Sequence, residues 1–129
     1  MSDFNLFVPV PPGATVFAGG LPAGCTQAGQ GSVRGTVYDL SGTGRVLMLY
    51  GDTPVTGEIW CCPDHSLRVL DARAGVGEGM RRRVARRVST AGGGEPVPCW
   101  LYVAGPALSR SLLPERRIAN PEAGRLGGD

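Results

Sequence analysis

The stretch from Val33 to Gly75 decides the fold, and it contains three short patterns: Val33-Arg34-Gly35-Thr36-Val37-Tyr38-Asp39-Leu40, Val55-Thr56-Gly57-Glu58-Ile59-Trp60 and Leu70-Asp71-Ala72-Arg73-Ala74-Gly75. In the first pattern small and apolar residues alternate with larger, more polar ones, which is the two-residue period of a strand. The third pattern continues a three- and four-residue spacing of apolar residues and stops at a glycine, as a helix does. The order therefore predicts strands followed by a helix.

Outward from this stretch, short apolar runs predict further strands at 6–10, 46–50, 54–62, 80–88 and 97–104. The strand at 80–88 places Val84, Arg86 and Val88 on one face. Residues 13–32, rich in Gly, Ala and Pro, predict a loop with at most one helical turn, and 41–44 and 51–52 predict turns. Asp64 is expected to cap the helix and Gly75 to end it. Several short strands and one helix indicate an α+β fold built on a strongly curved sheet or small barrel.

Composition narrows the class of protein. With 129 residues, 42% hydrophobic and 19% charged, the chain has the make-up of one soluble domain. Its net charge of +2 is too small to demand a polyanionic partner. All 13 basic residues are arginine, so no lysine is present to form a Schiff base. No leader-like N-terminus and no apolar run of about 20 residues is present, so we expect a cytoplasmic protein without membrane contact.

The four cysteines are expected to be reduced and mostly buried. They are Cys25, Cys61, Cys62 and Cys99. Cys61 and Cys62 are neighbours on a predicted strand, so their side chains point to opposite faces. A zinc site with His65 is disfavoured for the same reason and because no C-x-x-C pair exists. We expect neither a metal nor a cofactor.

In order and spacing, the three patterns resemble those of the γ-glutamylcyclotransferase-like family, which includes AIG2-like and BtrG-like proteins. The resemblance covers roughly residues 4 to 105. It implies an α+β fold, a small mixed β-barrel with a few flanking helices. We therefore expect residues 1–105 to form the γ-glutamylcyclotransferase-like domain and residues 106–129 to form a C-terminal extension that is partly disordered.

The resemblance also implies a reaction. In the family a γ-glutamyl amine attacks its own γ-carbonyl, closes a 5-oxoproline ring and expels an amine, while a glutamate carries the proton. The family glutamate corresponds to Ala74. The family turn Y-G-[ST]-[LN], whose N–H groups hold the oxyanion, falls on residues 9–12, of which Pro9, Pro11 and Pro12 have no N–H to donate.

By the same resemblance, five residues would form the substrate-binding site: Phe7, Val8, Pro9, Val10 and Ala74. Two carboxylates are candidates for the catalytic acid/base. Glu78 lies in the loop Gly77-Glu78-Gly79 shortly after Ala74, and Glu58 occupies the family's G-E strand position. The alternatives are a solvated loop residue for Glu78 and a structural carboxylate for Glu58.

Three functions remain open from the sequence. A diverged family member would be either a module that binds a small γ-glutamyl compound or a weak γ-glutamylamine cyclotransferase, so whether the protein is an enzyme is left undecided. The alternative is a small arginine-rich domain that binds an anion or nucleic acid through 81–83, Arg86 and Arg87. This run lacks the interleaved aromatic residues that stack on single strands, so nucleic acid is the less favoured partner. The oligomeric state is not predicted.

Overall fold

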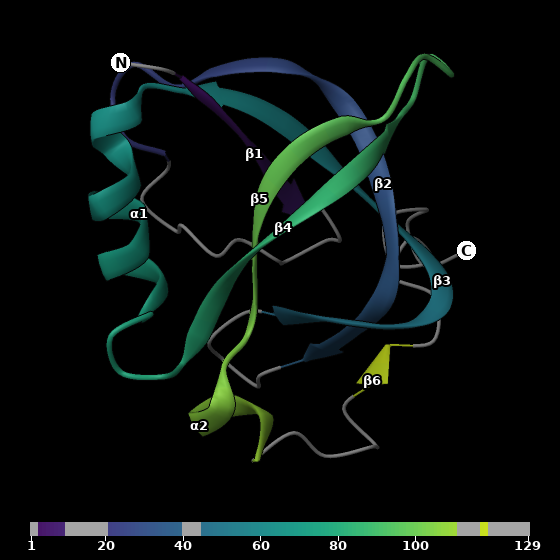
Figure 1. The fold of residues 1–129 in the computed structure, drawn as a ribbon. Coiled ribbons are helices and arrows are strands. Elements are labelled where there is room, and N and C mark those ends of the chain that lie inside the picture. The colour runs from purple at the N-terminus through teal and green to yellow at the C-terminus, as the bar shows by residue number, and fades with distance from the viewer. Residues whose placement is uncertain (1–2, 10–20, 40–44, 111–116, 119–129) are drawn as a thin grey trace.

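The protein folds as a small β-barrel with helices on its outside (Figure 1). The computed structural model describes residues 3–9, 21–39, 45–110 and 117–118. Its elements are β1 (Phe4–Pro9), β2 (Thr26–Asp39), β3 (Arg45–Cys62), the 3₁₀ turn η1 (Asp64–Ser66), α1 (Leu67–Ala74), β4 (Arg81–Thr90), β5 (Val97–Ala104), α2 (Pro106–Ser109) and β6 (Arg117–Ile118). The predicted α+β class and mixed barrel are confirmed.

The barrel closes because β3 pairs with two strands. The order is β3-β1-β5-β4-β2, and a long β2–β3 ladder joins the two ends. The β1–β5 pair is parallel and the other pairs are antiparallel, which makes the sheet mixed. β6 adds to the edge of β2. Between β2 and β4 only Gly31↔Thr90 and Ser32↔Ser89 are paired, so these two strands separate beyond that point.

The core has an inner part and an outer part. Phe7, Val55, Val88 and Leu101 are almost fully buried and belong to the cluster that fills the barrel. A second cluster lies under α1 on the outer wall; its buried members are Leu6, Cys62, Leu70, Ala74 and Tyr102. Alternate side chains of a barrel strand point to opposite faces, so one strand supplies both clusters. Leu6 and Phe7 of β1 show this division directly.

The prediction of a loop up to residue 32 is wrong for residues 26–31, because β2 already begins at Thr26. The glycines that indicated a loop are positions of close approach inside the sheet. A Cβ on Gly31 would lie 2.4 Å from the carbonyl oxygen of Ser89, and one on Gly57 would lie 2.4 Å from the carbonyl oxygen of Val8. Only glycine leaves room for neighbouring backbones at such points.

The two strands predicted at 46–50 and 54–62 are one strand, β3. The expected turn at 51–52 is a bulge instead. Gly35 pairs with Thr53 and the next residue, Thr36, pairs with Met48, so residues 49–52 of β3 have no partner on β2. Gly51 has a φ of +91° in this bulge, and the hydroxyl of Thr36 donates to the carbonyl oxygen of Tyr50 at 2.7 Å. The bulge bends β3 without ending it.

The helix begins differently from the prediction and ends as predicted. Asp64 is not its N-cap: the chain enters through η1, and Ser66 precedes α1 without a side-chain capping bond. The Ser66 hydroxyl donates instead to the carbonyl oxygen of Pro63 at 2.6 Å. Gly75 ends α1 in the left-handed region, with a φ of +77°. None of the helices among the described residues has the length and apolar character needed to span a bilayer. The turn expected at 41–44 lies outside the described residues.

Candidate functional site

The C-terminal end of α1 is anchored to the barrel by Asp71. The Tyr102 hydroxyl on β5 donates to Asp71 Oδ1 at 2.6 Å, and Arg83 Nη1 on β4 lies 3.0 Å from Asp71 Oδ2. The Arg83 guanidinium also lies 4.4 Å from the centre of the Trp100 ring, in a cation–π contact. Burial and the bond to Asp71 raise the pKa of Tyr102 above its ordinary value. Asp71 therefore fixes where the last turn of the helix lies.

Ala74, in that last turn, is enclosed by apolar side chains. It is 1% exposed and shares its cluster with Leu6, Leu70 and Tyr102. Val8 of β1, another predicted substrate-binding residue, packs against the same cluster while half-buried. The structure thus brings Val8 and Ala74 to one region, between the outer wall of the barrel and α1.

The other predicted substrate-binding residues lie elsewhere or are not described. Phe7 is 1% exposed inside the barrel, where its ring lies against Gly57. Pro9 is half-buried at the end of β1, where it also pairs with Gly57. Val10 lies outside the described residues, as do the prolines at 11 and 12.

The two candidate carboxylates lie on different elements near Val8 and Ala74, Glu58 on β3 and Glu78 in the turn after α1. Glu58 pairs with Val8 across β3 and β1, so it shares the outer face of the wall, and it accepts a hydrogen bond from the Trp60 indole at 3.0 Å. Glu78 is exposed in the turn after α1, and its Oε1 lies 3.6 Å from the point that a Cβ on Gly75 would occupy. Glu58 is held in place, whereas Glu78 lies beside the helix end in contact with solvent.

The described surface includes the following two pockets. One, of about 620 Å³, runs along α1 and includes His65, Asp71 and Arg83. His65 is exposed there. Within the described ranges, no three His, Cys, Asp or Glu side chains are grouped closely enough to hold a metal ion.

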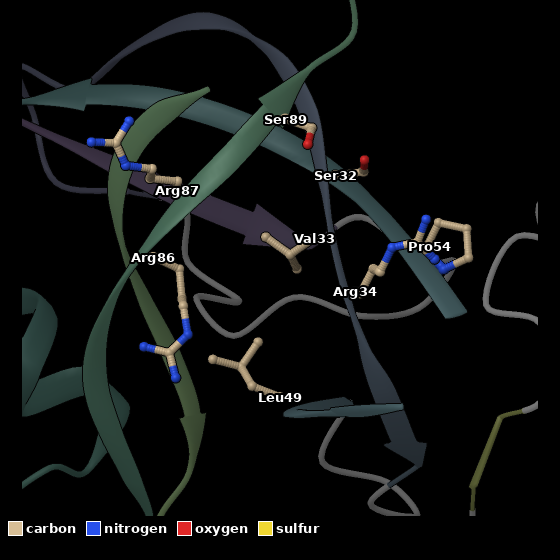
Figure 2. A pocket seen from close by; sticks show the side chains of 8 residues that line it. All are labelled: Ser32, Val33, Arg34, Leu49, Pro54, Arg86, Arg87 and Ser89. Atoms are coloured by element: carbon tan, nitrogen blue, oxygen red, sulfur yellow. The ribbon is translucent and has the colours of Figure 1, made fainter. Parts of the chain in front are cut away.

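The other pocket lies where β2 and β4 separate, and we call it the seam pocket (Figure 2). It has a volume of about 370 Å³ and is lined by Ser32, Val33, Arg34, Leu49, Pro54, Arg86, Arg87 and Ser89. The sequence predicted either a solvent face or an anion- or nucleic-acid-binding patch for the arginines of β4, but not this pocket. The two-residue alternation of side chains along this strand could have indicated the pocket. It places Arg86 on the same face as Val84 and Val88, and Val88 is fully buried.

Comparison with known proteins identifies the family. The model of the family described as gamma-glutamyl cyclotransferase, AIG2-like, matches residues 16–121. The chain therefore belongs to this family, as its three patterns predicted. The match does not favour the alternative of a small arginine-rich domain that binds an anion or nucleic acid. A search of curated proteins finds no match to the chain.

Solved structures share the fold at low sequence identity. An AIG2-like protein from Mus musculus superposes with a TM-score of 0.65 at 21% identity, covering 90% of this chain and 83% of the mouse chain. A gamma-glutamyl cyclotransferase gives a TM-score of 0.63 at 17% identity, covering 80% and 67%. A protein specific to uropathogenic E. coli, c4763, gives 0.62 at 16% identity, covering 99% and 98%. At these identities the likeness concerns the fold.

Proposed function

We propose that this chain is a diverged member of the family that binds a small γ-glutamyl compound and has lost the ring-closing chemistry. The observation that carries the proposal is the side chain at position 74. The family resemblance assigns the proton-carrying glutamate to this position, and the chain has a methyl group there, 1% exposed among apolar neighbours. A methyl group neither accepts nor donates a proton, so the general acid/base step has no agent at this point.

The surroundings of Ala74 support its assignment as the position of a former acid/base. A carboxyl buried beside Leu70 and Tyr102 would have its pKa raised by desolvation. Such a shift brings the pKa of a carboxyl group closer to neutral pH. A group that both takes and returns a proton works best when its pKa lies near the working pH. The surroundings of position 74 therefore have the apolar character that the chemistry asks for, without the carboxyl group itself.

Neither remaining carboxylate replaces the missing one well. Glu58 already accepts a hydrogen bond from the Trp60 indole, which holds its carboxylate on the outer wall. Glu78 is exposed in the turn after α1, so its carboxylate lies outside the buried cluster that encloses Ala74. If slow cyclotransferase activity on γ-glutamyl amines survives, these two residues are its acid/base candidates, and activity would fall in Glu58→Gln or Glu78→Gln.

The backbone gives a second reason. Pro9 stands in the turn that the resemblance assigns to the oxyanion donors, and a proline nitrogen has no hydrogen to donate. Loss of a single oxyanion donor lowers the rate by roughly 10²–10³-fold. A side-chain rotation cannot supply a missing main-chain donor. The change Ala74→Glu, which puts the glutamate back, should therefore not restore turnover by itself.

The test uses Ala74→Glu with Ala72→Glu as its matched control, because Ala72 is exposed on the same helix. Each purified variant is incubated with γ-glutamyl-ε-lysine, and 5-oxoproline is quantified by mass spectrometry. Binding of the same compound to the unmodified chain is measured by calorimetry, with free lysine as the comparison. We expect binding of the γ-glutamyl compound and no 5-oxoproline from either variant. Turnover by Ala74→Glu but not by Ala72→Glu would show that the oxyanion donors survive. If the unmodified chain does not bind the γ-glutamyl compound, the proposed ligand class is wrong.

A further inference from the structure

Arg86 occupies an inward-facing position on a barrel strand. In the β4–β5 ladder, Val84 pairs with Leu101, Arg86 with Cys99 and Val88 with Val97. Leu101, Cys99 and Val88 belong to the cluster that fills the barrel, so Arg86 shares their face. It is nevertheless exposed, because β2 does not cover β4 at this level. A charged group at a core-facing position is rare without a partner or solvent to stabilise it.

The positive charge at the seam pocket has no carboxylate partner within the part of the chain that the structure describes. Arg34 Nη1 donates to the carbonyl oxygen of Asp52 at 2.8 Å, and Arg86 Nη1 donates to that of Ala85 at 2.8 Å. The ion pair found among these residues is that of Asp71 with Arg83, away from this pocket. Each guanidinium carries five N–H donors, so most remain available to a ligand.

The rest of the pocket is apolar with two hydroxyl groups. Figure 2 shows that Arg86 extends from β4 toward Leu49, on the side where Val33 lies, while Arg34 lies apart from these three, next to Pro54. Ser32 and Ser89 lie at the end where the two strands still pair. A volume of about 370 Å³ lies within the range of about 300–1,000 Å³ that small-molecule sites occupy. The combination suits one small ligand with an anionic end and an apolar body.

We propose that the seam pocket binds a phosphate monoester with a small apolar group. Arg86 contacts the phosphate, since a guanidinium group matches phosphate oxygens in paired, charge-assisted hydrogen bonds. Val33 and Leu49 pack against the apolar group. This site is separate from the region around Ala74, and the inference holds whether or not the proposed function does.

The experiment measures binding of phenyl phosphate to the full chain by calorimetry, with inorganic phosphate and benzyl alcohol as comparisons. We expect phenyl phosphate to bind at least about tenfold more tightly than either, a difference of about 1.4 kcal/mol. Arg86→Gln should weaken binding by a similar factor, and Arg86→Lys should recover part of the loss, because it keeps the charge but not the fork of donors. Circular dichroism checks that each variant is folded.

The matched control is Arg82→Gln, which removes the same charge from an exposed position on the same face of β4. Four residues of strand separate it from Arg86 by roughly 13 Å, beyond the screening length of about 8–10 Å at physiological salt. We expect its affinity for phenyl phosphate to be unchanged. Equal losses in Arg82→Gln and Arg86→Gln, or equal binding of phenyl phosphate and inorganic phosphate, would show a general positive field and overturn the proposal. Tighter binding of a short RNA that competes with phenyl phosphate would do the same.

Discussion

Replacement of Asp71 by alanine tests how α1 is attached to the barrel. The change removes the acceptor of the Tyr102 hydroxyl and the partner of Arg83. A hydrogen bond to a charged group contributes about 1.5–3 kcal/mol. The ion pair is partly exposed, with side-chain exposures of 26% and 28%, so it adds at most about 1 kcal/mol. The higher helix propensity of alanine offsets no more than about 0.7 kcal/mol. The net loss in the free energy of unfolding is therefore about 1–3 kcal/mol.

Urea unfolding followed by tryptophan fluorescence measures this loss, because Trp100 lies against Arg83. Asp64→Ala is the control, since Asp64 is exposed and its change should stay within about 0.5 kcal/mol. A double-mutant cycle with Tyr102→Phe isolates the bond between the two side chains. Unfolding of Asp71→Ala at the same urea concentration as Asp64→Ala, or a cycle that gives no coupling, would show that the bonds of Asp71 do not hold α1 to the barrel.

Three further predictions concern pH, packing and thiols. Burial and the bond to Asp71 raise the pKa of Tyr102 above 10, so its contribution to stability is complete below pH 10 and is lost as pH rises further; alkaline urea titrations should show this loss and Tyr102→Phe should lack it. Gly31→Ala should destabilise by about 1–3 kcal/mol, whereas Gly29→Ala, with open space around it, should not, as thermal unfolding will show. Burial raises the pKa of Cys99 to about 11, so iodoacetamide at pH 8 should label Cys99 more slowly than half-exposed Cys61; equal rates measured by mass spectrometry would contradict this.

Some elements of the fold follow from local patterns and were predictable. The strand Val97–Ala104 was predicted with its observed bounds, because an apolar run between turn residues needs no distant information. The end of α1 at Gly75 was predicted because a glycine just after the last apolar residue is a local signal that a helix ends. Its positive φ in the structure agrees with this role. The family patterns then joined these pieces into a barrel, which spacing alone does not specify.

The errors arise where a distant strand decides the local structure. Gly31 looks like a loop residue in the sequence, yet it lies within β2 because the backbone at Ser89 needs the space. Gly51 looks like the end of a strand, yet β3 continues through it as a bulge opposite Gly35 and Thr36. The seam pocket was missed for the same reason, since the separation of β2 from β4 is set by barrel closure and not by any single segment.

The proposed function depends on position 74, to which the family resemblance assigns the proton-carrying glutamate and where this chain has a buried methyl group. The most direct test is the amount of 5-oxoproline that the unmodified, folded chain releases from γ-glutamyl-ε-lysine at high protein concentration over many hours. Because the methyl group of Ala74 cannot carry a proton, we expect no release above that of a blank without protein. A steady release in proportion to protein concentration would contradict this expectation and would show that another group carries the proton.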